Sequence, residues 1–203
     1  RRMAEELAAT EENGVLFADQ WNNLDNRRAH YHSTGPEIWE QTGGKVDGFI
    51  CAVGTGGTLA GTSTFLREKN PNIVVGCADP MGAAMYHLFK DGEAKATDGG
   101  SIAEGIGLGR VTAIIEDLKI EQPYAIDDQE AMPLLFDLIK DEGLVLGGSS
   151  GINVAGAVRL AKELGPGKTI VTILCDIGTR YTSKLFNREF LKSKDLPVPD
   201  FLP

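Results

Sequence analysis

Apolar runs and polar, glycine-rich segments alternate through most of this chain. The clearest case is an apolar run over residues 48–53, then glycines and threonines at 54–58, then a helix-like pattern over 59–69. Short apolar runs bounded by turn residues are typical of buried strands, so this region predicts a strand, a tight turn and a helix. Further strands are expected over residues 15–18, 73–78, 124–126 and 169–174.

Helices are expected between these strands. Thr34 is the expected cap of a helix whose first turn holds a proline and a glutamate, and Gly43 marks the end of that helix. Asp127 is the expected cap of a helix that runs to about residue 142, with Glu130 placed to complete a capping box. The remaining helices are expected over residues 1–9, 59–69, 83–89, 152–164 and a short stretch after 180, and loops over 21–28 and 95–109.

Strands that alternate with helices predict an α/β fold, in which a mostly parallel, twisted sheet carries helices on both faces. Ligands of such folds bind beyond the carboxyl ends of the strands. Three polar, glycine-rich loops are expected at that edge, over residues 54–58, 147–151 and 175–180. Their convergence is a second reason to expect a cofactor.

The first of these loops has the composition of an anion site: Gly54, Thr55, Gly56, Gly57 and Thr58. Backbone N–H groups at a helix start lack internal partners and lie at the positive end of the helix dipole. A tight turn without a ligand is the alternative. No Gly-Lys-Ser/Thr follows, which excludes a nucleotide-triphosphate loop, and the third glycine and acidic residue of a dinucleotide fingerprint are missing. A terminal phosphate on a small cofactor fits better.

Composition narrows the choice of function. The chain has 203 residues, 42% hydrophobic and 24% charged, with a net charge of −9 and no basic patch, which argues against nucleic-acid binding. No apolar run reaches membrane-spanning length and no secretion leader is recognised, so a cytoplasmic protein is expected. Cys51, Cys77 and Cys175 are predicted to be buried free thiols, and their spacing favours no metal site. His30 and His32 are assigned to a surface loop rather than to a metal pair, because no third ligand is near them in the sequence.

Five motifs occur in order, and together they resemble the cysteine synthases (O-acetylserine sulfhydrylases), fold-type-II enzymes that use pyridoxal 5′-phosphate (PLP). They are Thr34-Gly35-Pro36-Glu37-Ile38-Trp39, residues 54–58, Glu104-Gly105-Ile106-Gly107, Gly147-Gly148-Ser149-Ser150-Gly151, and Cys175-Asp176 through Arg180-Tyr181-Thr182-Ser183. The resemblance covers nearly the whole chain. It implies that residues 1–21 are a remnant of a smaller N-terminal domain and that residues 22–203 form the large domain, which binds the PLP phosphate.

The resemblance also implies roles for individual residues. The segment 54–58 would hold the PLP phosphate, and Ser149 would donate a hydrogen bond to the pyridine nitrogen, with a helix cap as its alternative role. A neutral serine there leaves PLP a weaker electron sink than a carboxylate would. Gln20, Gly105 and Gly107 would flank the substrate, although Gln20 also suits an exposed strand end. Asp176 would order the last loop.

The family's Schiff-base lysine has no counterpart in this chain. None of five candidate substitutes falls in a loop expected to face the cofactor: Lys45, Lys69, Lys90, Lys140 and Lys162. The chain also starts without a helix cap or an initiating Met. We therefore expect the C-terminal part of a longer enzyme, inactive by itself.

For the whole enzyme, the resemblance implies β-replacement that makes L-cysteine from O-acetylserine and sulfide, with PLP as the cofactor and ping-pong kinetics. It also implies a homodimer, and the C-terminal tail of serine acetyltransferase as a candidate partner. The alternatives are an enzyme like cystathionine β-synthase or serine dehydratase, a non-catalytic module that binds a phosphate ligand or a partner, and a nicotinamide-dinucleotide enzyme.

Overall fold

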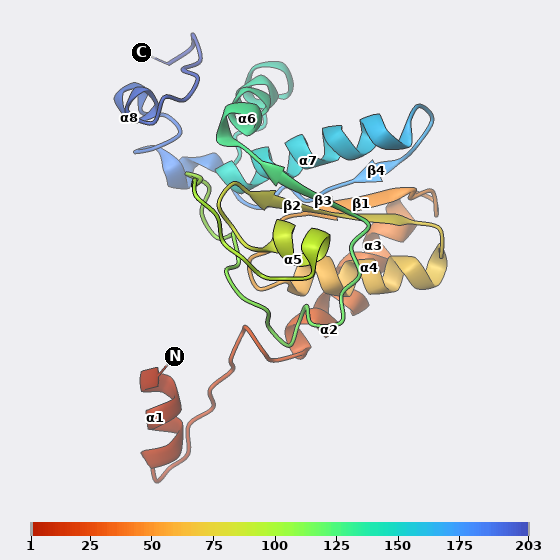
Figure 1. Ribbon diagram of the computed structural model, residues 1–203, viewed down its shortest axis with the longest axis vertical. Coiled ribbons are helices and arrows are strands. Elements are labelled where there is room, and N and C mark those ends of the chain that lie inside the picture. Colours follow the sequence, from red (N-terminus) through yellow and green to blue (C-terminus); the bar gives the residue numbers. More distant parts are fainter. Residues whose placement is uncertain (1, 203) are drawn as a thin grey trace.

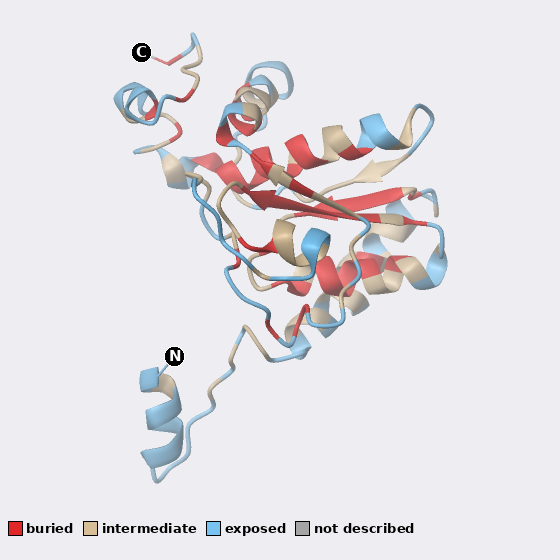
Figure 2. Ribbon diagram, in the orientation of Figure 1, coloured by how far each residue is buried: buried red, intermediate tan, exposed pale blue. Residues whose placement is uncertain are grey.

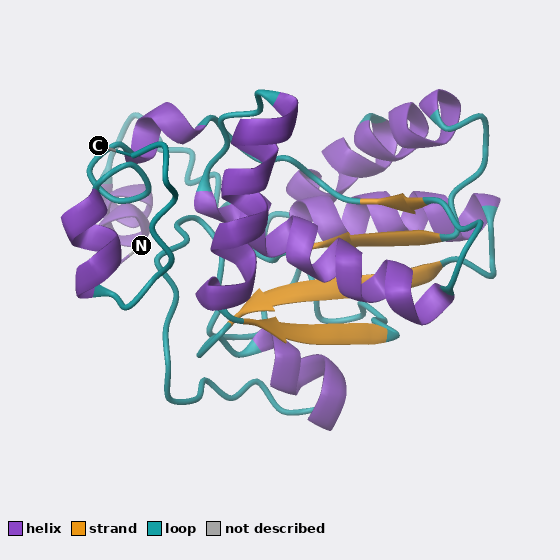
Figure 3. Ribbon diagram, turned by 90° about the horizontal axis from the view of Figure 1, so that it is seen from above, coloured by secondary structure: helices purple, strands orange, loops and turns teal. Residues whose placement is uncertain are grey.

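A four-stranded parallel sheet lies at the centre of the computed structural model, which describes residues 2–202 (Figure 1). The strand order is β3-β2-β1-β4, and all neighbouring strands are parallel. The strands lie side by side in Figure 3, and their bounds are β1 (Gly48–Cys51), β2 (Val74–Pro80), β3 (Gln122–Ile126) and β4 (Ile170–Val171). The predicted parallel α/β fold is confirmed.

Helices cover both faces of this sheet (Figure 1). One face carries α3 (Thr34–Gln41), α4 (Gly57–Lys69) and α5 (Met85–Asp91), and α2 (Asp25–His32) packs on the outer side of this layer against α4 and α3. The other face carries α6 (Asp128–Glu142) and α7 (Gly148–Leu164). A 3₁₀ turn, η1 (Gly178–Tyr181), and the short helix α8 (Arg188–Ser193) follow β4. None of the described helices is both long and apolar enough to cross a membrane.

Alternating side chains of β1 build two separate apolar layers. Phe49 and Cys51 pack among residues of α4, and Ile50 packs on the opposite face among residues of α6 and α7. Phe49 and Ile50 are both fully buried. Figure 2 shows the buried residues concentrated in the sheet and in the helix sides that face it. Burial on both faces is the reason why the strand reads as a continuous apolar run.

The first helix, α1 (Arg2–Thr10), lies apart from this body (Figures 1 and 2). It has no buried residue, and Leu16 in the connection that follows is 93% exposed. The predicted strand over residues 15–18 is wrong, because a strand needs a neighbour for its backbone hydrogen bonds and no described segment pairs with this one.

Helix α2 occupies a segment that was expected to be a loop. Its sequence lacks an apolar stripe, and tertiary contacts with α4 hold it instead. Arg27 donates to the Thr64 hydroxyl, and Tyr31 donates to Glu68 and meets the Phe65 ring edge-on. The loop prediction for residues 21–28 is therefore wrong from residue 25 onward, and so is the surface-loop assignment of the two histidines.

Three helix starts differ in part from the predicted pattern. Asp127 caps α6 by accepting a hydrogen bond from the Gln129 N–H, as expected. Glu130 does not complete the capping box, because its carboxylate pairs with Arg159 of α7. Helix α7 begins at Gly148 rather than near residue 152, which places Ser149 inside the first turn and removes its alternative role as a cap. At α3, Thr34 is the first helical residue and not a cap.

Strand β4 is shorter than the apolar run over residues 169–174 suggested. Beyond Val171, the side chain of Asn153 bridges the segments that follow β1 and β4. It accepts from the Ala52 N–H at 2.7 Å and donates to the Ile173 carbonyl at 2.7 Å. The Thr172 hydroxyl also donates to the Ile50 carbonyl. Side chains thus replace the backbone ladder at the end of this strand pair.

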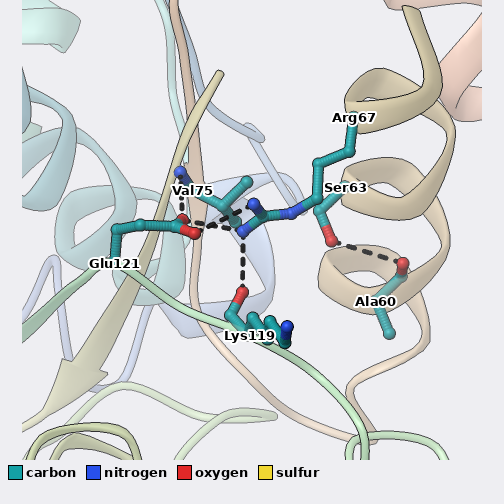
Figure 4. Close-up of polar contacts among 6 residues, drawn as sticks. All are labelled: Ala60, Ser63, Arg67, Val75, Lys119 and Glu121. Carbon is teal, nitrogen blue, oxygen red and sulfur yellow. Dashed lines mark hydrogen bonds and ion pairs between the residues drawn. The ribbon is translucent and has the colours of Figure 1, made fainter. Parts of the chain in front are cut away.

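At the amino ends of the strands, an ion pair joins α4 to the sheet (Figure 4). The Arg67 guanidinium donates two hydrogen bonds to the Glu121 carboxylate, at 2.9 and 2.7 Å, and one to the Lys119 carbonyl. The same carboxylate accepts from the Val75 N–H at 3.0 Å. This contact fixes the segment that leads into β3 against α4.

Candidate functional site

A cavity of about 460 Å³ opens at the carboxyl ends of the strands. All three loops expected at that edge contribute to its wall, together with the segment around Gly105. The lining residues are Ala52, Gly54, Thr55, Gly56, Thr58, Leu59, Glu104, Gly105, Ile106, Ser149, Cys175, Asp176, Arg180 and Tyr181. The convergence of the loops is thus realised in the structure.

The glycine loop between β1 and α4 has little room for side chains. Gly56 caps α4 with a left-handed φ of 94°, which disfavours other residues. A Cβ on Gly54 would overlap the Gly105 carbonyl oxygen, and one on Gly57 would overlap the side-chain oxygen of Asn26. Gly57 itself is buried behind the loop and does not line the cavity. The three glycines serve three different steric needs.

The same loop presents hydrogen-bond donors that have no acceptor. The first intrahelical bond of α4 runs from the Ala60 N–H to the Gly56 carbonyl. The N–H groups of Thr58 and Leu59, just before it, have no acceptor among the described residues. The Thr55 and Thr58 hydroxyls line the cavity beside them. Neutral donors at the positive end of a helix dipole are suited to an anion.

The second loop brings another helix start to the cavity. Ser149 lies in the first turn of α7, lines the cavity and is 5% exposed. Its neighbour Ser150 is fully buried and accepts a hydrogen bond from the Cys175 N–H at 2.9 Å. The buried serine thus joins the second loop to the third, while the preceding serine is left to face the cavity.

Asp176 joins the second and third loops as well. Its backbone carbonyl accepts from the Gly147 N–H, and its carboxylate accepts from the Tyr181 hydroxyl at 2.5 Å. That hydrogen bond raises the pKa of Tyr181 to about 12. The other carboxylate oxygen is buried without a partner among the described residues, and a Cβ on Gly147 would overlap it. These contacts support the expected ordering role of Asp176.

The three cysteines do not share one environment. Cys51 and Cys77 are buried, and burial raises the pKa of both thiols, so they are inert core residues as expected. Cys175 was also expected to be buried, but it is exposed and lines the cavity. It follows the shortened strand β4, where the chain leaves the sheet, and this position explains its exposure.

A second hollow of about 370 Å³ adjoins the first and shares Gly54, Thr55, Gly105 and Ile106 with it. Of these two hollows, Gln20 and Gly107 line the second and not the first. The Gly107 N–H donates to the Val53 carbonyl, which holds the segment against the end of β1. The residues expected to flank a substrate therefore gather next to the residues expected to hold a cofactor.

The described residues that line the two hollows include no lysine. Lys184 comes near through its ion pair with Glu104. The five candidate lysines of the sequence analysis do not line either hollow. Lys90, for example, contacts Tyr86 on α5. The part of the chain that the structure describes thus offers donors to the cavity but no amine on its wall.

Two residues close to the site were missed from the sequence. Asn26 and His30 lie on α2, and their side chains contact Thr55 and Thr58. The polar sequence of this segment predicts a loop, and a loop does not place its side chains on a shared face. The signal that could have revealed them is the spacing of four residues, which places an amide and an imidazole on one face of a helix.

A parallel α/β fold with an anion-accepting glycine loop and a polar cavity at the carboxyl edge defines a class of proteins that bind small phosphorylated ligands. The cavity also fits PLP, the group that the sequence motifs imply. Its wall combines the free N–H groups of Thr58 and Leu59, which suit a phosphate, with the neutral hydroxyl of Ser149.

Comparison with known proteins narrows this class. A family model described as "Pyridoxal-phosphate dependent enzyme" matches residues 1–176. Cysteine synthase 2 of Schizosaccharomyces pombe is 45% identical over 193 residues, which cover 89% of this chain and 49% of that protein. Cysteine synthase of Dictyostelium discoideum is 43% identical over 195 residues, which cover 92% of this chain and 52% of that protein.

The chain belongs to the family of pyridoxal-phosphate-dependent enzymes, and its resemblance to the fold-type-II cysteine synthases is confirmed. The solved structure of an O-acetylserine-dependent cystathionine β-synthase from Helicobacter pylori matches with a TM-score of 0.78 and 33% identity, covering 90% of this chain and 57% of that one. The chain spans about half the length of the curated relatives it matches.

Proposed function

We propose that the whole protein is a PLP-dependent cysteine synthase, which replaces the β-acetate of O-acetylserine with sulfide. The observation that carries the proposal is the pairing of two features on one cavity wall. One is the glycine loop with its unpartnered amides, and the other is the hydroxyl of Ser149. The identities of 45% and 43% to two cysteine synthases support the choice of reaction.

In this proposal the phosphate lies at the start of α4. The N–H groups of Thr58 and Leu59 and the hydroxyls of Thr55 and Thr58 hold it, and the glycines let the backbone approach it closely. Ser149 donates to the ring nitrogen. When bound, PLP supplies the electron sink for bond breaking at the α and β carbons of an amino acid.

The adjoining hollow is the proposed place of the substrate. Gln20 has a side-chain amide that can donate to a carboxylate, and Gly105 lines both hollows without a side chain to separate them. Gly107 fixes that segment through the Val53 carbonyl. A small amino acid in the second hollow would therefore meet a cofactor in the first.

We further propose that the 203-residue chain does not catalyse this reaction by itself, because the described walls carry no lysine that could act as the nucleophile. A homodimer in the cytoplasm, and docking of the C-terminal tail of serine acetyltransferase, are proposals that follow from the resemblance alone. A tail carboxylate would use the same donors as the substrate, since Gln20 faces that hollow.

The second candidate reaction is cystathionine formation. The match to an O-acetylserine-dependent cystathionine β-synthase favours it, because that protein is described as using O-acetylserine and as making cystathionine.

Full-length protein loaded with PLP tests both candidates. Its visible absorption band should change when O-acetylserine is added, and the amino-acid product should be measured with sulfide and with homocysteine. Faster turnover with sulfide supports cysteine synthase, and faster turnover with homocysteine supports the alternative. A protein that binds PLP but leaves O-acetylserine unchanged would contradict both.

A further inference from the structure

Helix α2 presents two polar side chains, one turn apart, to the glycine loop. Asn26 reaches Thr55, and His30 reaches Thr58. We propose that Asn26 and His30 are positioning residues that fix the hydroxyl protons of Thr55 and Thr58, so that both threonines donate to the bound anion. The inference rests on the proposed function in one respect, namely that the anion is the phosphate of PLP.

The orientation of the Asn26 amide follows from its neighbours. Its side-chain nitrogen lies 3.0 Å from the Gln20 backbone carbonyl and 2.9 Å from the Thr55 hydroxyl oxygen. A carbonyl oxygen can only accept, so the group facing Gln20 must be the NH₂. The second hydrogen of that NH₂ then points at Thr55. The Thr55 oxygen therefore accepts a hydrogen bond on this side.

A second donor acts on the same oxygen. The Gly57 N–H lies 3.4 Å from the Thr55 hydroxyl oxygen and donates to it weakly. With both lone-pair directions engaged, the hydroxyl proton of Thr55 is directed away from α2 and from Gly57. Thr55 lines both hollows, so the open direction is the cavity. This arrangement requires glycine at position 57, because a Cβ there would overlap the Asn26 side-chain oxygen.

His30 stands between two hydroxyls. Its Nδ1 lies 2.9 Å from the Thr34 hydroxyl and its Nε2 lies 3.2 Å from the Thr58 hydroxyl. In the neutral ring one nitrogen donates and the other accepts. If Nε2 carries the hydrogen, it donates to Thr58, which is then free to donate to an anion. If Nδ1 carries it, Thr58 must donate to Nε2 and turns only lone pairs toward the cavity.

We call the free N–H groups of Thr58 and Leu59 and the hydroxyls of Thr55 and Thr58 the phosphate cup. An anion bound in this cup repels lone pairs, so its binding selects the Nε2–H form of His30. Thr34 can accommodate this form, because its hydroxyl donates to a bare Nδ1. The packing of α2 on α4 keeps the ring in reach: Gly61 of α4 has no side chain, and a Cβ there would overlap the Arg27 carbonyl. The first residue of α3 is thereby linked to the cup through one imidazole.

The tautomer of His30 can be observed with the glycine loop and helix face that it joins left unchanged. The chain has three histidines, so ¹⁵N-histidine labelling with Ala substitutions of His32 and His87 assigns the signals of His30. At about pH 8 the ring is neutral, because burial lowers the pKa of His30 from its ordinary value of 6.5. Saturating PLP should leave a bare Nδ1 and a protonated Nε2. A bare Nε2 in the PLP-bound chain overturns the role of His30.

A double-mutant cycle tests Asn26. The dissociation constant of PLP is measured for Thr55→Val, Asn26→Ala and the double variant, with Thr55→Ser as the conservative control that keeps the hydroxyl. Thr55→Val should weaken binding about tenfold or more, since it removes a hydrogen bond to a charged group. Asn26→Ala should weaken binding several-fold in the wild-type chain and in Thr55→Ser. It should have no further effect in Thr55→Val.

Asn72→Ala, in an exposed turn at the opposite edge of the sheet, provides a matched control and should leave PLP affinity unchanged. Equal losses from Asn26→Ala in both backgrounds would show that Asn26 acts on folding alone, and that result overturns its role. If the wild-type chain binds no PLP, the proposed cup and this inference fail together. If PLP binds with the wrong tautomer and no coupling, only this inference fails.

Discussion

The two edges of the sheet differ in how their polar groups are satisfied. At the amino edge, charges meet charges: Asp47 pairs with Lys168 and accepts from the Thr169 N–H, and Glu121 pairs with Arg67 and accepts from the Val75 N–H. At the carboxyl edge, the N–H groups of Thr58 and Leu59 at the start of α4 have no acceptor among the described residues. The amino edge stabilises the fold, and the carboxyl edge is open to a ligand.

The pKa values of two carboxyl groups, one at each edge, are shifted in opposite directions. Burial alone would raise the pKa of Glu121, but the Arg67 guanidinium and the Val75 N–H together hold it below its ordinary value of 4.5. At the carboxyl end of β2, Asp79 is fully buried, and burial raises its pKa to about 6 although it accepts from the Tyr86 N–H. Its other oxygen has no partner among the described residues. One edge gains stability from its acids, and the other loses some.

The largest expected effect is the loss of PLP affinity when the glycine loop at the carboxyl edge is altered. Gly54→Ala should weaken PLP binding by about a thousandfold or more, because the new Cβ pushes the loop away from Gly105 and disrupts at least two hydrogen bonds to a charged group. Gly100→Ala is the matched control, since open space surrounds its Cβ and its φ is not left-handed. Calorimetric titration measures both. Equal affinity of the two variants would remove the steric role of Gly54.

Asp79→Asn should stabilise the protein by removing a buried carboxylate from the carboxyl edge. The amide can still accept from Tyr86 but carries no buried charge, so stability at pH 7 should rise by about 2–3 kcal/mol. Because the folded-state pKa of Asp79 lies above its ordinary value of 3.8, the charged form is disfavoured and the wild type loses stability as pH rises from about 4 to 6. Urea unfolding should therefore show the gain at pH 7 and none near pH 4. A loss of stability at pH 7 would contradict this.

Glu121→Gln should weaken the amino edge alone. It removes a bidentate ion pair that is partly exposed, so we expect a loss of roughly 1–2 kcal/mol in unfolding free energy at neutral pH. Because the folded-state pKa of Glu121 is lowered, its contribution is present above pH 4.5 and disappears as pH falls through the folded value. PLP affinity should not change. A parallel loss of affinity would show that the two edges are coupled.

The smallest expected effect concerns the cysteines. A thiol-alkylating reagent should label Cys175 and leave Cys51 and Cys77 unmodified in the folded chain, since only Cys175 is exposed. Bound PLP should slow this labelling, because Cys175 lines the cavity. Cys175→Ser should alter stability by less than about 0.5 kcal/mol. Mass spectrometry locates the label, and labelling of a core cysteine at the same rate would contradict the burial pattern.

Local sequence was sufficient for elements that form a continuous apolar run or carry their own turn residues. The run before Gly54 and the glycines after it predicted β1 and the start of α4, because both depend on nearby residues. It failed where distant partners decide the outcome. Asn153 ends β4 early, and the missing neighbour of residues 15–18 leaves them unpaired. Helix α2 depends on packing against α4, so Asn26 and His30 could not be placed beside the loop.

The central claim is that the free amides at the carboxyl edge are a phosphate site. The most direct test compares the affinity of the chain for PLP with its affinity for pyridoxal, which lacks the phosphate. Both ligands are titrated into the 203-residue chain, where the described walls of the two hollows offer no lysine to either aldehyde. PLP should bind at least about a hundredfold more tightly, a difference of about 2.7 kcal/mol. Equal affinities for PLP and pyridoxal would contradict the assignment of the glycine loop as the phosphate site.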